Sequence, residues 1–101
     1  MPAISMKVNG EAIYSSQPIA PYEVKQGDNG TWVFTQVEKS IYAIWIPGKE
    51  NKNPAPLNLS GFQVKGVKPL NPNNQTKLKN GVLSVEIHNN TLSTPQVFRL
   101  Q

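Results

Sequence analysis

The sequence predicts an all-β fold, an antiparallel two-sheet β-sandwich of about seven or eight short strands. The first observation behind this prediction is the density of turn-forming residues. Nine Pro, seven Gly and eleven Asn are spread through 101 residues, which interrupts the chain too often for long helices. The second observation is that the segments between these residues are short and alternate apolar with polar side chains, as strands do.

The N-terminal segment departs from this pattern. Residues 1–14 do not alternate cleanly, and the pair Asn9-Gly10 is typical of the end of a helix. We therefore expect a remnant of helix or an irregular segment there, with the helix over Ile4–Val8. Residues 15–30 are expected to be mostly irregular, with one short strand over Tyr22–Lys25.

The next two segments predict a hairpin. Thr31–Gln36 places Trp32 and Phe34 on one side, and Ser40–Ile46 is apolar on both sides. A strand that is apolar on both faces belongs in the centre of a sheet. Because the connection between the segments is short, they should pair antiparallel.

The remaining strands are predicted from the same alternation and from turn signals. The segment between residues 47 and 56 is polar and is expected to form an exposed loop. The tight-turn pair Asn80-Gly81 should precede a strand. The candidate strands are Pro56–Leu59, Gln63–Lys68 with an interruption at Gly66, Val82–Ile87, and Gln96–Leu100 with Phe98 and Leu100 facing inward.

Composition and charge exclude several classes of function. The net charge is +4, but the lysines are scattered and Arg99 is the only arginine, so we expect no nucleic-acid partner. No apolar run is long enough to span a bilayer, so we expect no membrane contact. The chain has no cysteine, which excludes a disulfide scaffold and a thiolate metal site.

Acid–base chemistry also lacks candidates. The one aspartate, Asp28, lies in a turn-like sequence, and the one histidine, His88, shares a strand face with Glu86. Two ligands do not complete a catalytic zinc site, which takes three protein ligands. We therefore expect no catalytic residue, no metal and no cofactor. Four Asn-x-Ser/Thr sequons, at Asn29, Asn58, Asn74 and Asn89, are attributed to the abundance of asparagine.

The aromatic side chains leave two interpretations open. Trp32 aligns with Phe34 and Trp45 with Ile41, which favours packing in the core. Alternatively, Trp32 and Trp45 could form a flat platform on which sugar rings stack. The second interpretation describes an independent carbohydrate-binding module.

One stretch carries a family resemblance. The run K-V-N-G-E-A-I-Y, Lys7–Tyr14, resembles a hallmark of the α-L-fucosidases of glycoside hydrolase family 29, in which a similar segment joins the catalytic barrel to a C-terminal β-sandwich. Later segments are similar to strands of that sandwich in the same order: Trp32–Gln36, Ser40–Ile44, Gly81–Val85 and Val97–Leu100. The chain departs from the family pattern at Met6, where a Trp is common, and at Ser15–Ile19.

The resemblance implies that the chain is the C-terminal accessory domain of a retaining exo-α-L-fucosidase. Residues 1–14 would be the remnant of the last barrel helix with its linker, and residues 15–101 the sandwich. The upstream catalytic barrel of the same polypeptide would hold the catalytic carboxylates and bind the fucosylated glycans. Ile13 and Tyr14 would contact that barrel, because they lie at the junction. Family habit implies a secreted, periplasmic or lysosomal protein. An immunoglobulin-like interaction domain is a further alternative, which rests on fold class alone.

Overall fold

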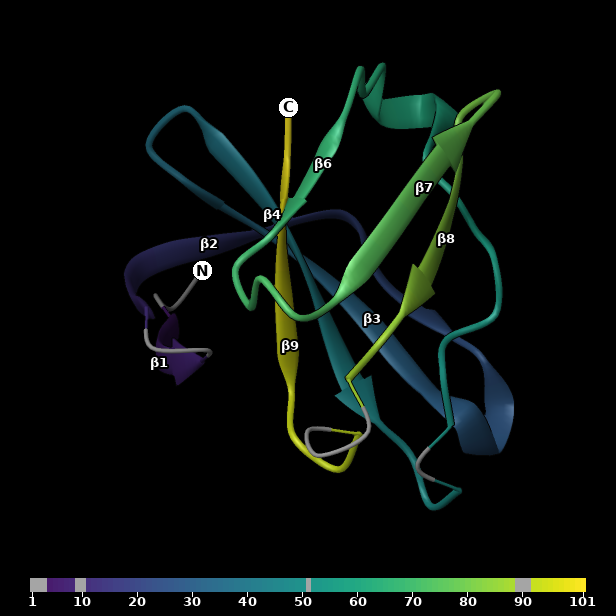
Figure 1. Cartoon of the computed structure of the whole chain (residues 1–101). Coiled ribbons are helices and arrows are strands. Elements are labelled where there is room, and N and C mark those ends of the chain that lie inside the picture. Colours follow the sequence, from purple (N-terminus) through teal and green to yellow (C-terminus); the bar gives the residue numbers. More distant parts are fainter. Residues whose placement is uncertain (1–3, 9–10, 51, 89–91) are drawn as a thin grey trace.

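The computed structural model describes residues 4–8, 11–50, 52–88 and 92–101, with side chains described from residue 18 onward. These residues form two antiparallel sheets, so the predicted all-β sandwich is confirmed (Figure 1). The larger sheet has six strands in the order β1-β2-β3-β4-β9-β6, and the smaller has three in the order β5-β8-β7. Their bounds are β1 Ile4–Val8, β2 Glu11–Lys25, β3 Gly30–Val37, β4 Ser40–Pro47, β5 Leu57–Asn58, β6 Val67–Pro69, β7 Gln75–Lys79, β8 Val82–Glu86 and β9 Gln96–Leu100. Short 3₁₀ turns occupy Gly27–Asn29 and Ser60–Phe62.

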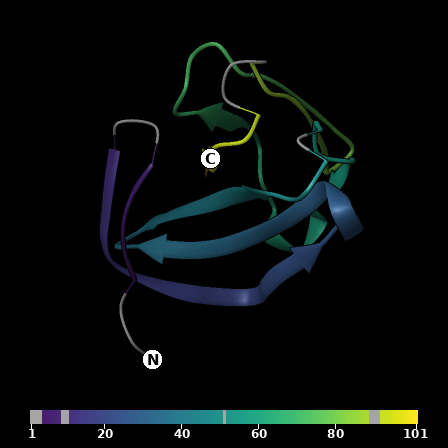
Figure 2. The ribbon, with the colours of Figure 1, turned by 90° about the horizontal axis from the view of Figure 1, so that it is seen from below.

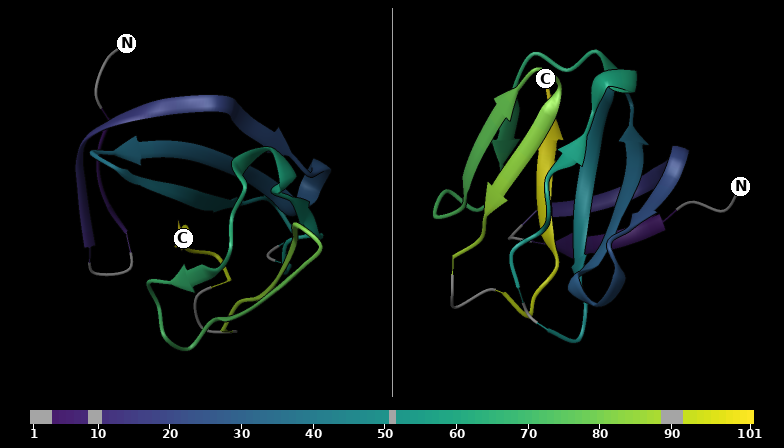
Figure 3. Two further views of the ribbon diagram at one scale, coloured as in Figure 1. Left: turned by 90° about the horizontal axis from the view of Figure 1, so that it is seen from above. Right: turned by 90° about the vertical axis from the view of Figure 1, so that its right-hand side faces the viewer.

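The helix expected near the N-terminus is wrong, because Ile4–Val8 is strand β1. Apolar and polar residues alternate along this segment of the sequence, which suits a strand. β1 pairs antiparallel with β2, and Val8 lies opposite Glu11. An Asn-Gly pair between two strands is a stronger signal for a hairpin than for the end of a helix. Figures 2 and 3 show this hairpin on the side of the molecule away from β7 and β8.

The second strand corrects a further expectation. Residues 15–21, expected to be irregular, belong to β2, which runs from Glu11 to Lys25, and the short strand predicted over Tyr22–Lys25 is the end of β2. β2 therefore crosses the boundary expected after residue 14, and the division of the chain at that point stays a prediction.

The β3–β4 hairpin forms as predicted and carries much of the core. Trp32 lies opposite Trp45 in the register, and β4 lies between β3 and β9 in the sheet. The two indole rings are 5.2 Å apart between centroids, and Trp32 lies 5.5 Å from the ring of Phe98. Leu83 of β8 belongs to the same buried cluster, so this cluster lies between the two sheets.

The opposite face of the large sheet holds a second, smaller apolar cluster. Tyr42 and Ile44 of β4 and Val97 of β9 are buried there, and Ile46 and Leu70 pack against them half-buried. Alternate residues of a strand point to opposite faces of its sheet, which accounts for the two clusters. The prediction that β4 is apolar on both sides is therefore confirmed.

The β7–β8 hairpin and the short strand β5 make up the small sheet, in which β8 is central. Asn80 and Gly81 have φ values of 53° and 78°, which is the conformation of the two-residue hairpin turn that Asn-Gly favours. The strand after this turn was predicted, whereas β7 was not. Asn74, just before β7, is buried and donates from Nδ2 to Gln96 Oε1 at 2.8 Å. This hydrogen bond joins the start of β7 to β9 of the large sheet.

Candidate functional site

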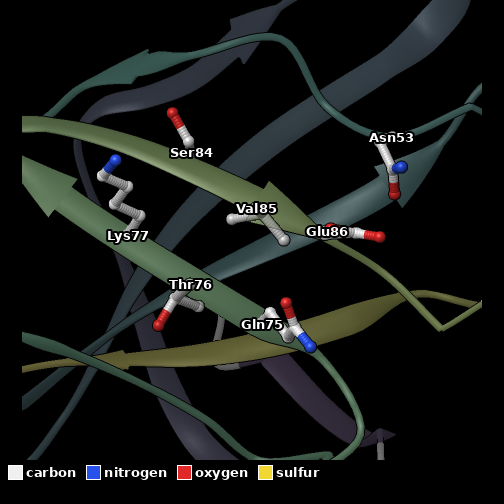
Figure 4. Close-up of a pocket in the computed structure, with 7 residues that line it drawn as sticks. All are labelled: Asn53, Gln75, Thr76, Lys77, Ser84, Val85 and Glu86. Atoms are coloured by element: carbon white, nitrogen blue, oxygen red, sulfur yellow. The ribbon is translucent and has the colours of Figure 1, made fainter.

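The outer face of the small sheet carries an open depression that encloses about 410 Å³ (Figure 4). Its lining combines amide, hydroxyl, ammonium and carboxylate side chains. The residues are Asn53, Gln75, Thr76, Lys77, Ser84, Val85 and Glu86. Figure 4 shows Lys77 and Ser84 toward one end and Asn53 and Glu86 toward the other.

The pairing of β7 with β8 positions these side chains. Gln75 lies opposite Glu86 and Lys77 lies opposite Ser84. All four side chains are exposed. Gln75 and Lys77 share one face of β7, and Ser84 and Glu86 share one face of β8, because alternate residues of a strand point to the same side. Val85 points toward the core and is buried. The register of one hairpin therefore places two rows of polar side chains next to each other on one surface.

The depression continues in both directions along the hairpin. Toward the start of β7 it adjoins a hollow of about 180 Å³ that shares Gln75 and Glu86 and adds Asn73 and His88. Toward the Asn80-Gly81 turn it adjoins a hollow of about 330 Å³ that shares Lys77 and Ser84. Pro56, Lys79 and Val82 line this last hollow. We refer to the three hollows together as the outer groove.

One wall of the outer groove is held by a side chain from outside the sheet. Asn53 lies before β5, and its Oδ1 accepts a hydrogen bond from the backbone N of Ile87 at 2.8 Å. This bond ties the loop to the end of β8. The polar groups that face the groove can donate and accept hydrogen bonds, and Lys77 and Lys79 add positive charge.

A second candidate surface is a bulge in β2. Pro18 pairs with Thr35 and Glu23 with Val33, so residues 19–22 lie opposite Phe34 alone. Tyr22, at the end of the bulge, has a φ of 68° and is 53% exposed. A bulky residue with positive φ is uncommon, and such conformations cluster at functional sites.

An apolar depression of about 490 Å³ lies beside this bulge, lined by Ile19, Ala20, Pro21, Gln36, Gly61 and Phe62. The ring of Phe62 packs on that of Phe34 with centroids 4.9 Å apart, so the floor of the depression belongs to the core. Tyr22 and the apolar residues of this depression are together called the β2 bulge surface.

The predicted site residues are two buried tryptophans and two residues of β2. Trp32 and Trp45 are 0% exposed, so neither ring can stack on a sugar, and the platform interpretation is wrong. Alternation places both rings between the sheets, as the core interpretation expected. Ile13 and Tyr14 lie on β2, but their side chains are outside the described part of the structure, and their role at an interface stays a prediction.

The titratable residues that the sequence singled out do not form a metal centre. Asp28 lies in the short 3₁₀ turn before β3, as its turn-like sequence predicted. Glu86 and His88 both line the outer groove. Within residues 4–8, 11–50, 52–88 and 92–101, no three His, Asp or Glu side chains gather closely enough to hold a metal ion. The described residues include no helix long and apolar enough to cross a membrane.

One sequon is closed to glycosylation in the folded chain. Asn74 is 4% exposed, and both ends of its amide are engaged. Its Nδ2 donates to Gln96 Oε1, and its Oδ1 accepts from the backbone N of His88 at 2.9 Å. Asn58 is exposed, with its Oδ1 accepting from the backbone N of Ser60. Asn89 lies outside the described residues.

Sequence reasoning missed Gln75 and Lys77. The polar residues Gln75, Lys77 and Lys79 alternate with Thr76 and Leu78, and this pattern could have identified β7. Its place beside β8 then follows from the Asn-Gly turn. Comparison of the chain with protein-family models, with curated proteins and with solved structures finds no match.

Proposed function

We propose that the chain is a non-catalytic accessory domain of a retaining α-L-fucosidase and that it packs on the catalytic barrel of that enzyme. The Lys7–Tyr14 motif and the ordered series of strand motifs support the identity of the enzyme. An all-β sandwich is also the fold that this resemblance implies. In this proposal the barrel binds and cleaves the fucosylated glycan, and the sandwich supports it.

The observation that carries the packing role is the β2 bulge surface. A strained backbone holds Tyr22 half exposed beside an apolar depression, and the folded chain must supply the free energy that keeps this conformation. Tyrosine is enriched at protein interfaces, because its ring offers a large apolar area with a polar tip. Tyr22 and residues 19–21 of this surface lie on β2, the same strand as Ile13 and Tyr14. β2 therefore carries the end of the junction motif and part of the exposed apolar surface.

Assays with a nitrophenyl α-L-fucoside test the proposal directly. We expect no turnover by the 101-residue chain, because the carboxylates of the reaction would belong to the barrel. We expect turnover by the complete product of the reading frame that encodes this sequence. Turnover by the chain alone, or an upstream reading frame that encodes no barrel, would overturn the proposal.

A variant pair tests the interface. Tyr22→Ser in the complete protein should lower the melting temperature of the catalytic barrel while leaving the melting temperature of the isolated 101-residue chain unchanged. Val82→Ser is the matched control, because Val82 is also an exposed apolar residue but lies on the small sheet. Equal effects of the two substitutions on the barrel would contradict a contact at the β2 bulge surface.

A further inference from the structure

We infer that the outer groove binds an acidic oligosaccharide, a chain of sugar units that carry carboxylate or sulfate groups. This inference does not depend on the proposed accessory role or on the identity of the enzyme. It rests on the shape of the groove, on the chemistry of its lining and on the charges that the small sheet carries.

The shape suits an extended ligand. Three hollows adjoin along one hairpin and share lining residues. The groove therefore follows the whole of β7, which at strand spacing covers about 14 Å from Gln75 to Lys79. A single small molecule would occupy one hollow, whereas a short polymer would occupy all three.

The lining suits a ligand with many hydroxyl groups. Amides of Asn53, Asn73 and Gln75 and the hydroxyl of Ser84 line the groove, and each can both donate and accept hydrogen bonds. At the end near the hairpin turn, Pro56 and Val82 add apolar contacts, against which the C–H face of a sugar can pack. This mixture matches a polar ring compound with apolar faces.

The charges favour an acidic ligand. Lys77 and Lys79 are two residues apart on the exposed face of β7, and neither forms an ion pair with the described residues. Glu86 lies toward the other end of the groove, so the acidic groups of the ligand should bind at the end that holds the lysines. The spacing of the two lysines is about 7 Å along the strand, which suits repeated charges on a polymer.

The strands of the small sheet carry a small excess of positive charge. β7 contributes Lys77 and Lys79, β8 contributes Glu86, and β5 has no charged residue. Such a local excess attracts anions to the surface that carries it.

Nucleic acid is the other anionic polymer to consider, and the lining disfavours it. Single-stranded nucleic acid is bound by aromatic side chains on which bases stack, together with basic residues. The residues that line the outer groove include no aromatic ring other than the imidazole of His88, and no arginine. Hydrogen bonds to hydroxyl groups of the ligand are therefore the main contacts that the outer groove can make.

Titration calorimetry with the full 101-residue chain at low salt tests the inference. The probes are a heparin-derived hexasaccharide, a hexamer of galacturonate, a neutral hexamer of glucose and a twelve-nucleotide single-stranded DNA. We expect saturable binding of at least one acidic hexamer, weaker binding of the neutral hexamer and a clear loss of affinity as salt screens the lysines. Absence of binding by both acidic hexamers at low salt overturns the inference, as does equal or tighter binding of the DNA or of the neutral hexamer.

A matched pair of double variants locates the site. Lys77→Gln with Lys79→Gln should weaken binding about tenfold or more, a loss that two surface charge contacts can produce. Lys39→Gln with Lys49→Gln removes the same charge from exposed positions outside the groove and should change affinity little. Equal losses in the two variants would mean attraction to net charge alone and would overturn the inference.

A third variant acts by repulsion and does not depend on the lysines. Ser84→Glu places a carboxylate in the middle of the groove and should abolish binding, whereas Ser84→Ala should weaken it only slightly. Because Ser84 is exposed, both variants should fold, which the amide spectrum of each checks. Binding that survives Ser84→Glu unchanged would contradict the assignment of the site.

Discussion

Gly30, at the start of β3, offers the sharpest test of the structural reasoning. Its φ of 148° and ψ of −163° belong to a region that is essentially restricted to glycine. A Cβ at this position would clash with the carbonyl oxygen of Ile46 and lie 2.6 Å from Cζ2 of Trp45. Gly30→Ala therefore combines backbone strain with a clash against the centre of the core.

The two effects can be given magnitudes. A residue held in such a conformation costs about 1–3 kcal/mol, and overpacking of a core costs about 1–3 kcal/mol. We expect Gly30→Ala to lower the free energy of unfolding by about 2–6 kcal/mol, the sum of the two contributions. For a domain of this size, that corresponds to a fall in melting temperature of at least about 8 °C.

Two other glycines separate these contributions. Gly27 has a φ of 62° and open space around it, so Gly27→Ala should cost only the strain, about 1–2 kcal/mol. Gly61 has open space and no positive φ, so Gly61→Ala should be neutral or stabilise by about 0.4–1 kcal/mol. Urea unfolding monitored by tryptophan fluorescence measures all three variants, since both tryptophans are buried. A Gly30 variant as stable as the Gly61 variant would refute the reasoning.

Three further predictions follow from contacts in the structure. Asn74→Ala removes both hydrogen bonds of its side-chain amide and should cost about 1–3 kcal/mol in urea unfolding; no loss would mean that these two bonds contribute nothing. Phe98→Ala empties part of the core and should cost about 3–5 kcal/mol by the same measurement, and a loss below 1 kcal/mol would contradict its packing. A hydrogen bond and the charge of Glu50 raise the pKa of Lys52. Glu50→Gln should therefore lower that pKa in an NMR titration and leave the melting temperature unchanged, because the pair is exposed; an unchanged pKa would count against the contact.

Local sequence patterns were sufficient to predict the β3–β4 hairpin and the last strand, β9. Ser40–Ile46 was predicted as a central strand because it is apolar on both sides, and β4 lies between β3 and β9. The bounds predicted for the last strand, Gln96–Leu100, agree with β9, because Pro95 limits where its ladder can begin. In both cases the signal comes from neighbouring residues.

The errors came from signals with more than one meaning. Asn9-Gly10 can follow a helix or join two strands, and the choice depends on whether a second strand is present to pair with the first. Only the end of β2, Tyr22–Lys25, was predicted as a strand, because Pro18 and Pro21 interrupt the alternation before it. β7 was overlooked although its alternation is regular, because its exposed residues are polar and only Leu78 is strongly apolar.

The candidate sites depend still more on distant contacts. The sequence could not decide between core and sugar platform for Trp32 and Trp45, since alternation gives the face of a strand but not what covers that face. Packing of the small sheet on the large one buries both rings. In the same way, one wall of the central hollow of the outer groove depends on Asn53, which reaches the end of β8 across 34 positions of the chain.

The sequence alone therefore determined the all-β class, the central hairpin, the direction in which most core residues face and the expectation of a fucosidase accessory domain. These follow from alternation, turn chemistry and motif, which act over a few neighbouring residues. The tertiary structure decided which apolar faces are covered, that Tyr22 remains exposed, and that two rows of polar side chains form one groove. Those outcomes depend on register and on packing between segments far apart in the chain, and single-sequence patterns do not carry that information.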